Sequence, residues 1–304
     1  MPLSYEVQEH KKDAHKYIVI NGYEGKVSDL VIPKEIDGYP VEAIGNHAFS
    51  GRQDIECVEL LESIKTLYGF AFHNCRNLKK IILHDSIDDY YDGVCRQCDN
   101  LTDIEMFMDR GWYEVVRNFL ADNDKTLRFW LHVRTSADES TSCLSFPEYV
   151  YDFNENTMAR TIQFSIAGSG MFYRECVDRR TMDYRQYDRL FDKAIIDGGE
   201  VAEDIAVGRL LYPVELSDEA RKKYEDFVEA NAEKILLRLV DTSEKKTENK
   251  DMIKRLVSYS KDLVSSSIDM AIRFATSKGL TEVAAIIMDY GAKKEEGTME
   301  IFEL

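Results

Sequence analysis

The sequence predicts an α+β protein, in which a short β-solenoid built from repeats comes first and an irregular α-helical domain follows. Apolar residues recur at a step of 23 between residues 41 and 106. Inside each copy, apolar residues two apart have the spacing of a strand. After residue 146, apolar residues recur at helical spacing instead. A chain of 304 residues has room for about two such domains.

The 23-residue step is clearest where Ala48-Phe49, Ala71-Phe72 and Val94-Cys95 follow one another. Val58 and Leu60 lie two residues apart, so they point to the same face of one strand. A unit of this size cannot bury its own apolar face, so consecutive copies must stack. The same step links further apolar columns: Val41, Ile64 and Ile87; Ile55, Leu78 and Leu101; Val58, Ile81 and Ile104; and Leu60, Leu83 and Met106.

The cysteine and asparagine columns of the repeat are predicted to be structural. Cys95 and Cys98 have the spacing of half a zinc site, but no second pair follows, and Cys98 repeats the position of Cys75. We therefore interpret both as small buried apolar residues. Asn77 and Asn100 are expected to bond to exposed backbone groups at the turns, forming a stacked ladder.

Several short sequence motifs in the repeats resemble those of a known family. They are Val31-Ile32-Pro33, residues 36–41, Ile44-Gly45, Ala48-Phe49, Ala71-Phe72, Asn74-Cys75 and Asn77-Leu78. Residues 17–108 or so resemble the BspA-like (surface-antigen type) leucine-rich repeats of bacteria. The resemblance implies a stacked solenoid of strands and turns. It also implies a surface for protein recognition, because better-known members attach to host components.

Composition shifts predict the organisation of the rest of the chain. We expect a lead-in over residues 1–16, a repeat domain over 17–134, a linker over 135–145, a helical domain over 146–292 and a mobile tail over 293–304. The linker is predicted because residues 135–142 are small and polar.

Local patterns predict particular elements within this outline. A helix is expected near 112–122, a last strand near 127–133, and a helix that opens at Phe146-Pro147. Ser217 is expected to cap a long helix that runs to about Val240. Residues 269–291 weakly resemble an ankyrin-style helix pair.

The formal charge of −17 argues against nucleic acid and anionic membranes as partners. No run of about 18 apolar residues is present, so no membrane span is predicted. The first residues lack the apolar core of a secretion signal. We expect a cytoplasmic location, or a surface or secreted one if a signal peptide has been removed.

The favoured function is a non-enzymatic protein–protein interaction module that presents the repeat surface to a protein of unknown identity. Its side chains would point outward from regular strands or provide exposed aromatic rings. The candidate binding residues are Glu56, Glu59, Lys79, Lys80, Tyr91 and Trp112.

Two alternatives stay open. An enzyme or small-anion receptor would use the glycine-rich turn and arginines of the helical part, and a structural protein would self-assemble through the solenoid edge. No catalytic residue, cofactor or metal site is predicted, because the six histidines lack His-Glu-x-x-His spacing and His132 has the setting of a core histidine. The candidate anion-binding residues are Gly168, Gly170, Arg174, Arg179 and Arg180.

Overall fold

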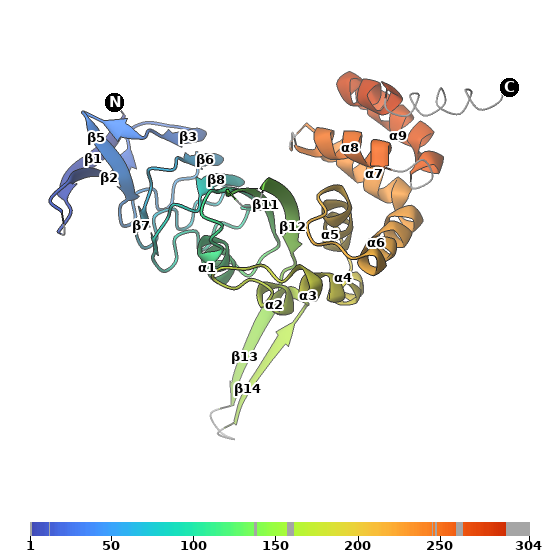
Figure 1. Cartoon of the computed structure of the whole chain (residues 1–304), viewed down its shortest axis with the longest axis horizontal. Helices are drawn as coiled ribbons and strands as arrows, with labels where there is room; N and C mark the ends of the chain where they lie inside the picture. Colours follow the sequence, from blue (N-terminus) through green and yellow to red (C-terminus); the bar gives the residue numbers. More distant parts are fainter. Residues whose placement is uncertain are drawn as a thin grey trace. The chain divides into compact units, whose positions relative to one another are not determined.

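The computed structural model describes residues 2–11, 13–136, 139–156, 161–244, 246, 248–259 and 264–289. The chain forms two compact units, Met1–Val201 and Ala202–Leu304. The predicted mobile tail over 293–304 lies outside the described residues. Figure 1 shows short stacked strands in the first unit and helices in the second.

The repeats stack as parallel strands of a six-stranded sheet, which we call sheet I. Its strand order is β12-β11-β10-β8-β6-β3. Cys57 pairs with Lys80 and Lys80 with Asp103, so each strand pairs with its equivalent 23 residues later. The predicted 23-residue repeat is therefore confirmed, because residues 23 apart pair with each other on neighbouring strands. The strands are β3 (Asp29–Ile32), β6 (Cys57–Leu60), β8 (Lys80–His84), β10 (Asp103–Met108), β11 (Leu127–Arg134) and β12 (Glu139–Phe146).

A second sheet, sheet II, collects the short strands that follow in each coil. Ile44, Leu67 and Tyr90 pair in register across its parallel strands. Its order is β1-β2-β5-β7-β9, with β4 paired to β5. The strands are β1 (Leu3–Glu9), β2 (Lys16–Tyr23), β4 (Glu35–Ile36), β5 (Tyr39–Ile44), β7 (Thr66–Leu67) and β9 (Asp89–Tyr90).

The aromatic turns hold consecutive coils together. Phe49 and Phe72 are buried, and their rings stack at 5.3 Å with planes 4° apart. The amide of Phe49 donates to the carbonyl of Ala71 at 2.8 Å, and the amide of Phe72 to that of Val94 at 2.9 Å. Side-chain and backbone repeats therefore coincide, as expected of stacked units that share one interior.

The polar columns also have the predicted structural roles. The Asn77 amide donates to the Gln53 carbonyl at 2.6 Å, and the Asn100 amide to the Arg76 carbonyl at 2.7 Å. The Cys98 thiol is buried and donates to the Phe72 carbonyl at 3.1 Å. All six cysteines are free thiols. The interpretation of Cys95 and Cys98 as buried structural residues agrees with this.

The structure corrects the prediction at both ends of the solenoid. Residues expected to be a lead-in include β1, which pairs antiparallel with β2. Residues expected to be a linker include most of β12, which pairs antiparallel with β11. Leu144 and Phe146 of β12 are buried, and Phe146 meets Phe129 edge-on at 5.5 Å. The small polar residues misled the prediction, because strand pairing satisfies their backbone groups and the buried Ser142 hydroxyl accepts from the Tyr184 hydroxyl.

A β-hairpin replaces the helix predicted to open at Phe146-Pro147. Strand β13 (Val150–Asn156) pairs antiparallel with β14 (Thr161–Ala167), as Figure 1 shows. The period-two alternation of apolar residues over 161–166 favours a strand. The spacing of Tyr149, Val150 and Phe153 therefore does not mark a helix.

In the described part of the first unit, four helices lie wholly before its end at Val201. The predicted helix near 112–122 is α1 (Glu114–Asp122). The hydroxyl of Tyr187 donates to the Ser145 carbonyl at 2.6 Å, so helix α3 is fixed to β12. The others are α2 (Gly170–Arg174), α3 (Tyr184–Arg189) and α4 (Phe191–Asp197).

The second unit is helical, as predicted. Ser217 caps α6 by accepting from the amide of Ala220, but the expected long helix is interrupted at Asn231. Arg238 donates to buried Glu203 at 2.7 Å, which joins α7 to α5. The helices are α5 (Val201–Leu211), α6 (Asp218–Ala230), α7 (Ala232–Thr242), α8 (Glu248–Tyr259), α9 (Ser265–Ser277) and a helix over 281–289. Among the described residues, no helix is both long and apolar enough to cross a bilayer.

Candidate interaction face of sheet I

Alternation along the strands divides the side chains of sheet I between the core and one outward face. Val58 and Leu60 of β6 are buried, so Cys57 and Glu59 lie on the outward face and are half-buried. The same alternation places Val31 of β3 outward, where it is 53% exposed. We call this outward face of β3, β6, β8, β10 and β11 the sheet I face.

A row of flat rings crosses three neighbouring strands of this face. Phe107 of β10 lies between His84 of β8 and His132 of β11, with ring centroids 5.2 and 5.0 Å away. These distances follow from the strand spacing of about 4.8 Å, because residues in register stack their side chains. The guanidinium of Arg134 lies 4.5 Å from the centroid of the Phe107 ring. These contacts between neighbouring side chains fix the three rings in the free protein.

Glu105 connects the charged groups beside this row. It accepts from the His132 ring at 3.2 Å and from the Lys80 ammonium at 2.9 Å, so three strands meet at one carboxylate. The hydrogen bond from His132, with help from Lys80, holds the pKa of Glu105 at about 2. The carboxylate is thus charged at neutral pH.

Toward β12 the outward side chains become buried. Arg128 of β11 pairs with Asp103 of β10, with 2.6 Å between Nε and Oδ1. Trp130 follows on β11 and is 6% exposed. The accessible part of the sheet I face therefore runs from β3 to the ring row.

A match to a known protein family agrees with the repeat geometry. Residues 23–110 match the family described as the BspA type leucine rich repeat region (6 copies). This part of the chain is a BspA-type leucine-rich repeat region. No curated protein matches the chain in sequence.

Solved leucine-rich repeat proteins match about a third of this chain at low identity. A leucine rich cell surface protein from Faecalibacterium prausnitzii A2-165 matches with 21% identity and a TM-score of 0.29, over 35% of this chain and 31% of that one. The leucine rich repeat protein of T. pallidum matches with 20% identity and a TM-score of 0.24, over 34% and 68% of the two chains. One from Bacteroides capillosus ATCC 29799 matches with 17% identity and a TM-score of 0.25, over 35% and 99%. The chain thus spans about a third of the first of these proteins.

Of the predicted binding residues, Glu59 and Lys80 lie on the sheet I face of the BspA-type region. Glu56 and Lys79 immediately precede β6 and β8, where they form an exposed ion pair at 2.6 Å. These four residues are brought together along neighbouring coils.

Tyr91 and Trp112 lie apart from the sheet I face. Tyr91 follows β9 of sheet II and stacks on Tyr68 at 5.2 Å. Trp112 lies in the loop before α1, with the Arg110 guanidinium 4.7 Å from its ring centroid. Both rings are about half exposed, so each stays a separate candidate contact.

Sequence reasoning missed the ring row, although the signal for it was present. Ile81 and Leu83 were assigned to the core, so His84, which keeps the alternation, had to lie outward with Ile82. The prediction that His132 is a core histidine is wrong. It is half-buried on the outward side, where it also contacts the Thr141 hydroxyl at 3.2 Å.

The predicted anion-binding residues form a turn organised by Arg174. Its five N–H groups donate to the carbonyls of Leu120, Pro147, Gly170, Asn123 and Lys125, at 2.6–3.2 Å. Burial lowers the pKa of this guanidinium to about 10.

Glycine is required at Gly170, since a Cβ there would lie 2.2 Å from the Pro147 carbonyl oxygen. Gly168 has a positive φ of 90°. The nearby arginines are exposed, and Arg179 pairs with Glu114 at 3.2 Å while Arg180 follows it in the chain.

A pocket of about 350 Å³ lies at the C-terminal end of α1. Its charged walls carry both signs, so it does not select an anion by charge. Burial raises the pKa of Asp122, which accepts from the Tyr90 hydroxyl at 2.8 Å. The charged and aromatic lining residues are Arg96, Lys125, Asp99, Asp122, Asp124 and Tyr149.

A thiol lies among the outward side chains of the sheet I face. Cys57 is the thiol on this face, and burial raises its pKa, so little of the reactive thiolate forms at neutral pH. Within the described residues, one group of three metal-ligating side chains was found, and it lies in the turn between β1 and β2, away from sheet I.

Proposed function

We propose that the BspA-type region is a protein-interaction module, and that the partner docks on the sheet I face across the ring row. The observation that carries this proposal is the stack of His84, Phe107 and His132 with Arg134 over its central ring. Aromatic and arginine side chains dominate the binding energy of protein interfaces. A partner with an aromatic or aliphatic side chain and an acidic rim would complement the row and Arg134.

The rigidity of the face supports the same proposal. Register pairing fixes the strands, and the bonds of Glu105 to His132 and Lys80 restrain the charged side chains before binding. Restrained side chains lose little entropy when a partner docks, which improves affinity for a given contact area. Half-exposed Val31 and Ile82 extend the contact toward β3.

The test compares full-length variants in quantitative affinity capture of a partner. We expect Phe107→Ala combined with His132→Ala to weaken capture at least tenfold, because the central ring and one end ring of the row are removed. Tyr91→Ala and Trp112→Ala are matched controls, since each removes an exposed aromatic ring outside the face. Circular dichroism would verify that every variant remains folded.

Two outcomes would contradict the proposal. A partner lost with Tyr91→Ala or Trp112→Ala, but retained by the double variant, would move the site to those rings. A partner retained by all the variants would place recognition outside the sheet I face.

An enzyme or small-anion receptor at the glycine turn is the second candidate. The exposed side chains of Arg179 and Arg180 support it, whereas the N–H groups of Arg174 already donate to carbonyls. A thermal-shift screen with phosphate and nucleotides tests this candidate. No stabilisation of the wild type, and no difference on Arg179→Ala, would remove it.

Self-assembly through a sheet edge is the third candidate. It rests on strand β3, which ends sheet I and carries exposed Asp29 and Val31. Unpaired backbone groups at such an edge can add a strand from a second copy. Light scattering over a concentration series would show a rising mass, which Val31→Lys would abolish; a constant mass would exclude the candidate.

A further inference from the structure

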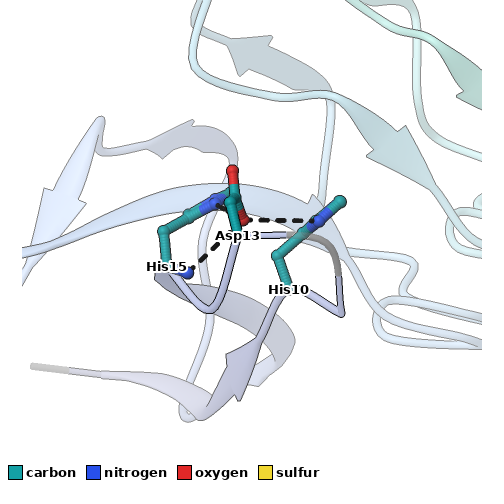
Figure 2. A group of neighbouring side chains, drawn as sticks. All are labelled: His10, Asp13 and His15. Atoms are coloured by element: carbon teal, nitrogen blue, oxygen red, sulfur yellow. Dashed lines mark hydrogen bonds and ion pairs between the residues drawn. The ribbon is translucent and has the colours of Figure 1, made fainter.

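The turn between β1 and β2 brings two imidazoles and one carboxylate together. His10, Asp13 and His15 come from this turn, and Figure 2 shows Asp13 between the two rings. One ligand atom from each residue lies within 4.8 Å of the others. We propose that these three side chains form a binding site for a divalent transition-metal ion such as Zn²⁺.

The backbone of the turn holds the two histidines side by side. The amide of His10 donates to the carbonyl of His15 at 2.8 Å, and the amide of Ala14 donates to the carbonyl of His10 at 2.9 Å. The imidazole rings stack with centroids 5.1 Å apart and planes 12° apart. The paired strands β1 and β2 thus set the spacing of the ligands.

The distances between ligand atoms suit a tetrahedral ion. Oδ1 of Asp13 lies 2.8 Å from Nδ1 of His15 and 3.6 Å from Nδ1 of His10. Zinc bonds of about 2.0–2.1 Å to nitrogen and oxygen place neighbouring tetrahedral ligands about 3.3 Å apart. The ligand atoms of the two histidines lie within 4.8 Å of each other, so shifts of up to about 1.5 Å in these exposed side chains would complete the site, with water as the fourth ligand.

The carboxylate of Glu42 contacts the ring of His15 on the side away from Asp13. It lies on β5, next to β2, and its Oε2 is 3.1 Å from Nε2 of His15. With Nδ1 of His15 bound to a metal, its Nε2–H donates to this carboxylate. Metal-bound histidines almost always have such a partner, which fixes the tautomer and the ring orientation. Glu42 is therefore the positioning residue of the site.

The ligand set indicates the class of ion. Imidazole suits zinc, copper and nickel, whereas calcium and magnesium prefer sites made of oxygen ligands alone. The carboxylates of Asp13 and Glu42 together balance the two positive charges of the ion. Tyr17 borders the site, with its ring 5.9 Å from that of His15.

The experiment titrates Zn²⁺ into the tag-free full chain and follows the heat of binding. We expect saturable binding of about one ion per chain. His10→Gln, Asp13→Asn and His15→Gln should each weaken it at least tenfold, because each removes a ligand. Glu42→Gln should weaken it about tenfold to a hundredfold, as is typical for a carboxylate that orients a ligand histidine.

The matched control is His47→Asn, which removes an exposed histidine from a repeat turn. His47 has a positive φ of 55°, which asparagine tolerates. Zinc affinity should change by less than twofold in this variant. In the nitrogen-15 spectrum of the wild type, zinc should shift Nδ1 of His15 while Nε2 keeps its proton.

The proposal is overturned if the wild type shows no saturable zinc binding. It is also overturned if the His10→Gln, His15→Gln double variant binds zinc as tightly as the wild type. Unchanged affinity in Glu42→Gln, together with loss of the Nε2 proton on His15 when zinc binds, would contradict its positioning role.

Discussion

At the scale of the residue, Arg174 shows how one side chain can organise a junction. Its planar guanidinium donates to five carbonyls, two of which, those of Leu120 and Asn123, belong to the C-terminal end of α1. These carbonyls have no partner within the helix, so an external donor stabilises them. The Tyr149 ring lies 4.8 Å from the guanidinium and covers it.

Replacing Arg174 tests this role. We expect Arg174→Lys to lower the free energy of unfolding by about 2–4 kcal/mol, because an ammonium cannot reach five carbonyls in one plane. Urea unfolding measures the change. The control Arg180→Lys, at an exposed neighbour, should alter stability by less than about 0.5 kcal/mol. Equal effects of the two variants would contradict the role.

The stacked rings of Phe49 and Phe72 give a second prediction at this scale. Phe72 is fully buried against Phe49, so Phe72→Ala should cost about 3–5 kcal/mol of unfolding free energy through the lost contacts and the cavity. Val31→Ala, on the exposed surface of β3, should cost less than about 1 kcal/mol. Chemical denaturation compares them, and a small loss at Phe72 would show that the coils do not share an interior.

At the scale of the element, strand alternation decides which residues can meet a partner. The outward position of Glu105 and Phe107 follows from the core positions of Ile104 and Met106, which the 23-residue step identifies. That part of the face could be predicted from the sequence. The last strand predicted near 127–133 is β11, but its register could not be predicted, because Asp103 pairs with Arg128, 25 residues later, after a coil that contains α1.

Other elements could not be predicted from the sequence, for different physical reasons. The small polar residues 135–142 make the start of β12 look like a linker, yet Ser142 is buried and contacts the hydroxyl of Tyr184. The metal-ligating turn was overlooked because His10 and His15 come together only when β1 pairs with β2. The antiparallel pairing of consecutive strands, rather than the pattern within one strand, creates both features.

The Glu105 contacts across three strands give a prediction about pH. Its folded pKa of about 2 lies below the usual value of 4.5, so the stability it contributes is full above about pH 4.5 and is lost as pH falls toward 2. Glu105→Gln should therefore cost about 1–2 kcal/mol at pH 7, after allowance for partial exposure.

The same variant should cost little near pH 2, where about half of the wild-type Glu105 carboxyls are protonated in the folded protein and most of the charge-dependent stability has been lost. Urea unfolding of both chains at the two pH values measures the difference. Glu59→Gln is the matched control on the neighbouring strand β6. An effect of Glu105→Gln that is independent of pH would contradict the assignment of the stability to its charge.

At the scale of the whole molecule, the chain is organised as two compact units with a boundary after Val201. Gly198 and Gly199 both have positive φ angles just before α5, so this stretch is a natural place to divide the chain. Strand β12 belongs to the first unit through its pairing with β11.

Truncation tests this organisation. A chain that ends at residue 199 should fold, with a cooperative transition in circular dichroism and one symmetric peak in size-exclusion chromatography. A chain that ends at residue 134 should aggregate, because it loses β12 and exposes Phe129. A stable, monomeric 1–134 fragment would show that β12 is dispensable.

Strand β12 runs antiparallel to β11, and this reversed direction limits where further coils can be added to the solenoid. A further coil could not be appended after β11, where that reversed strand already occupies the edge of sheet I. Duplicating the stretch 58–80 would instead insert one more 23-residue layer between β6 and β8, and both edges of the sheet would be left as they are. A longer version of this protein is therefore made by inserting repeats between existing coils, not by adding them at the ends.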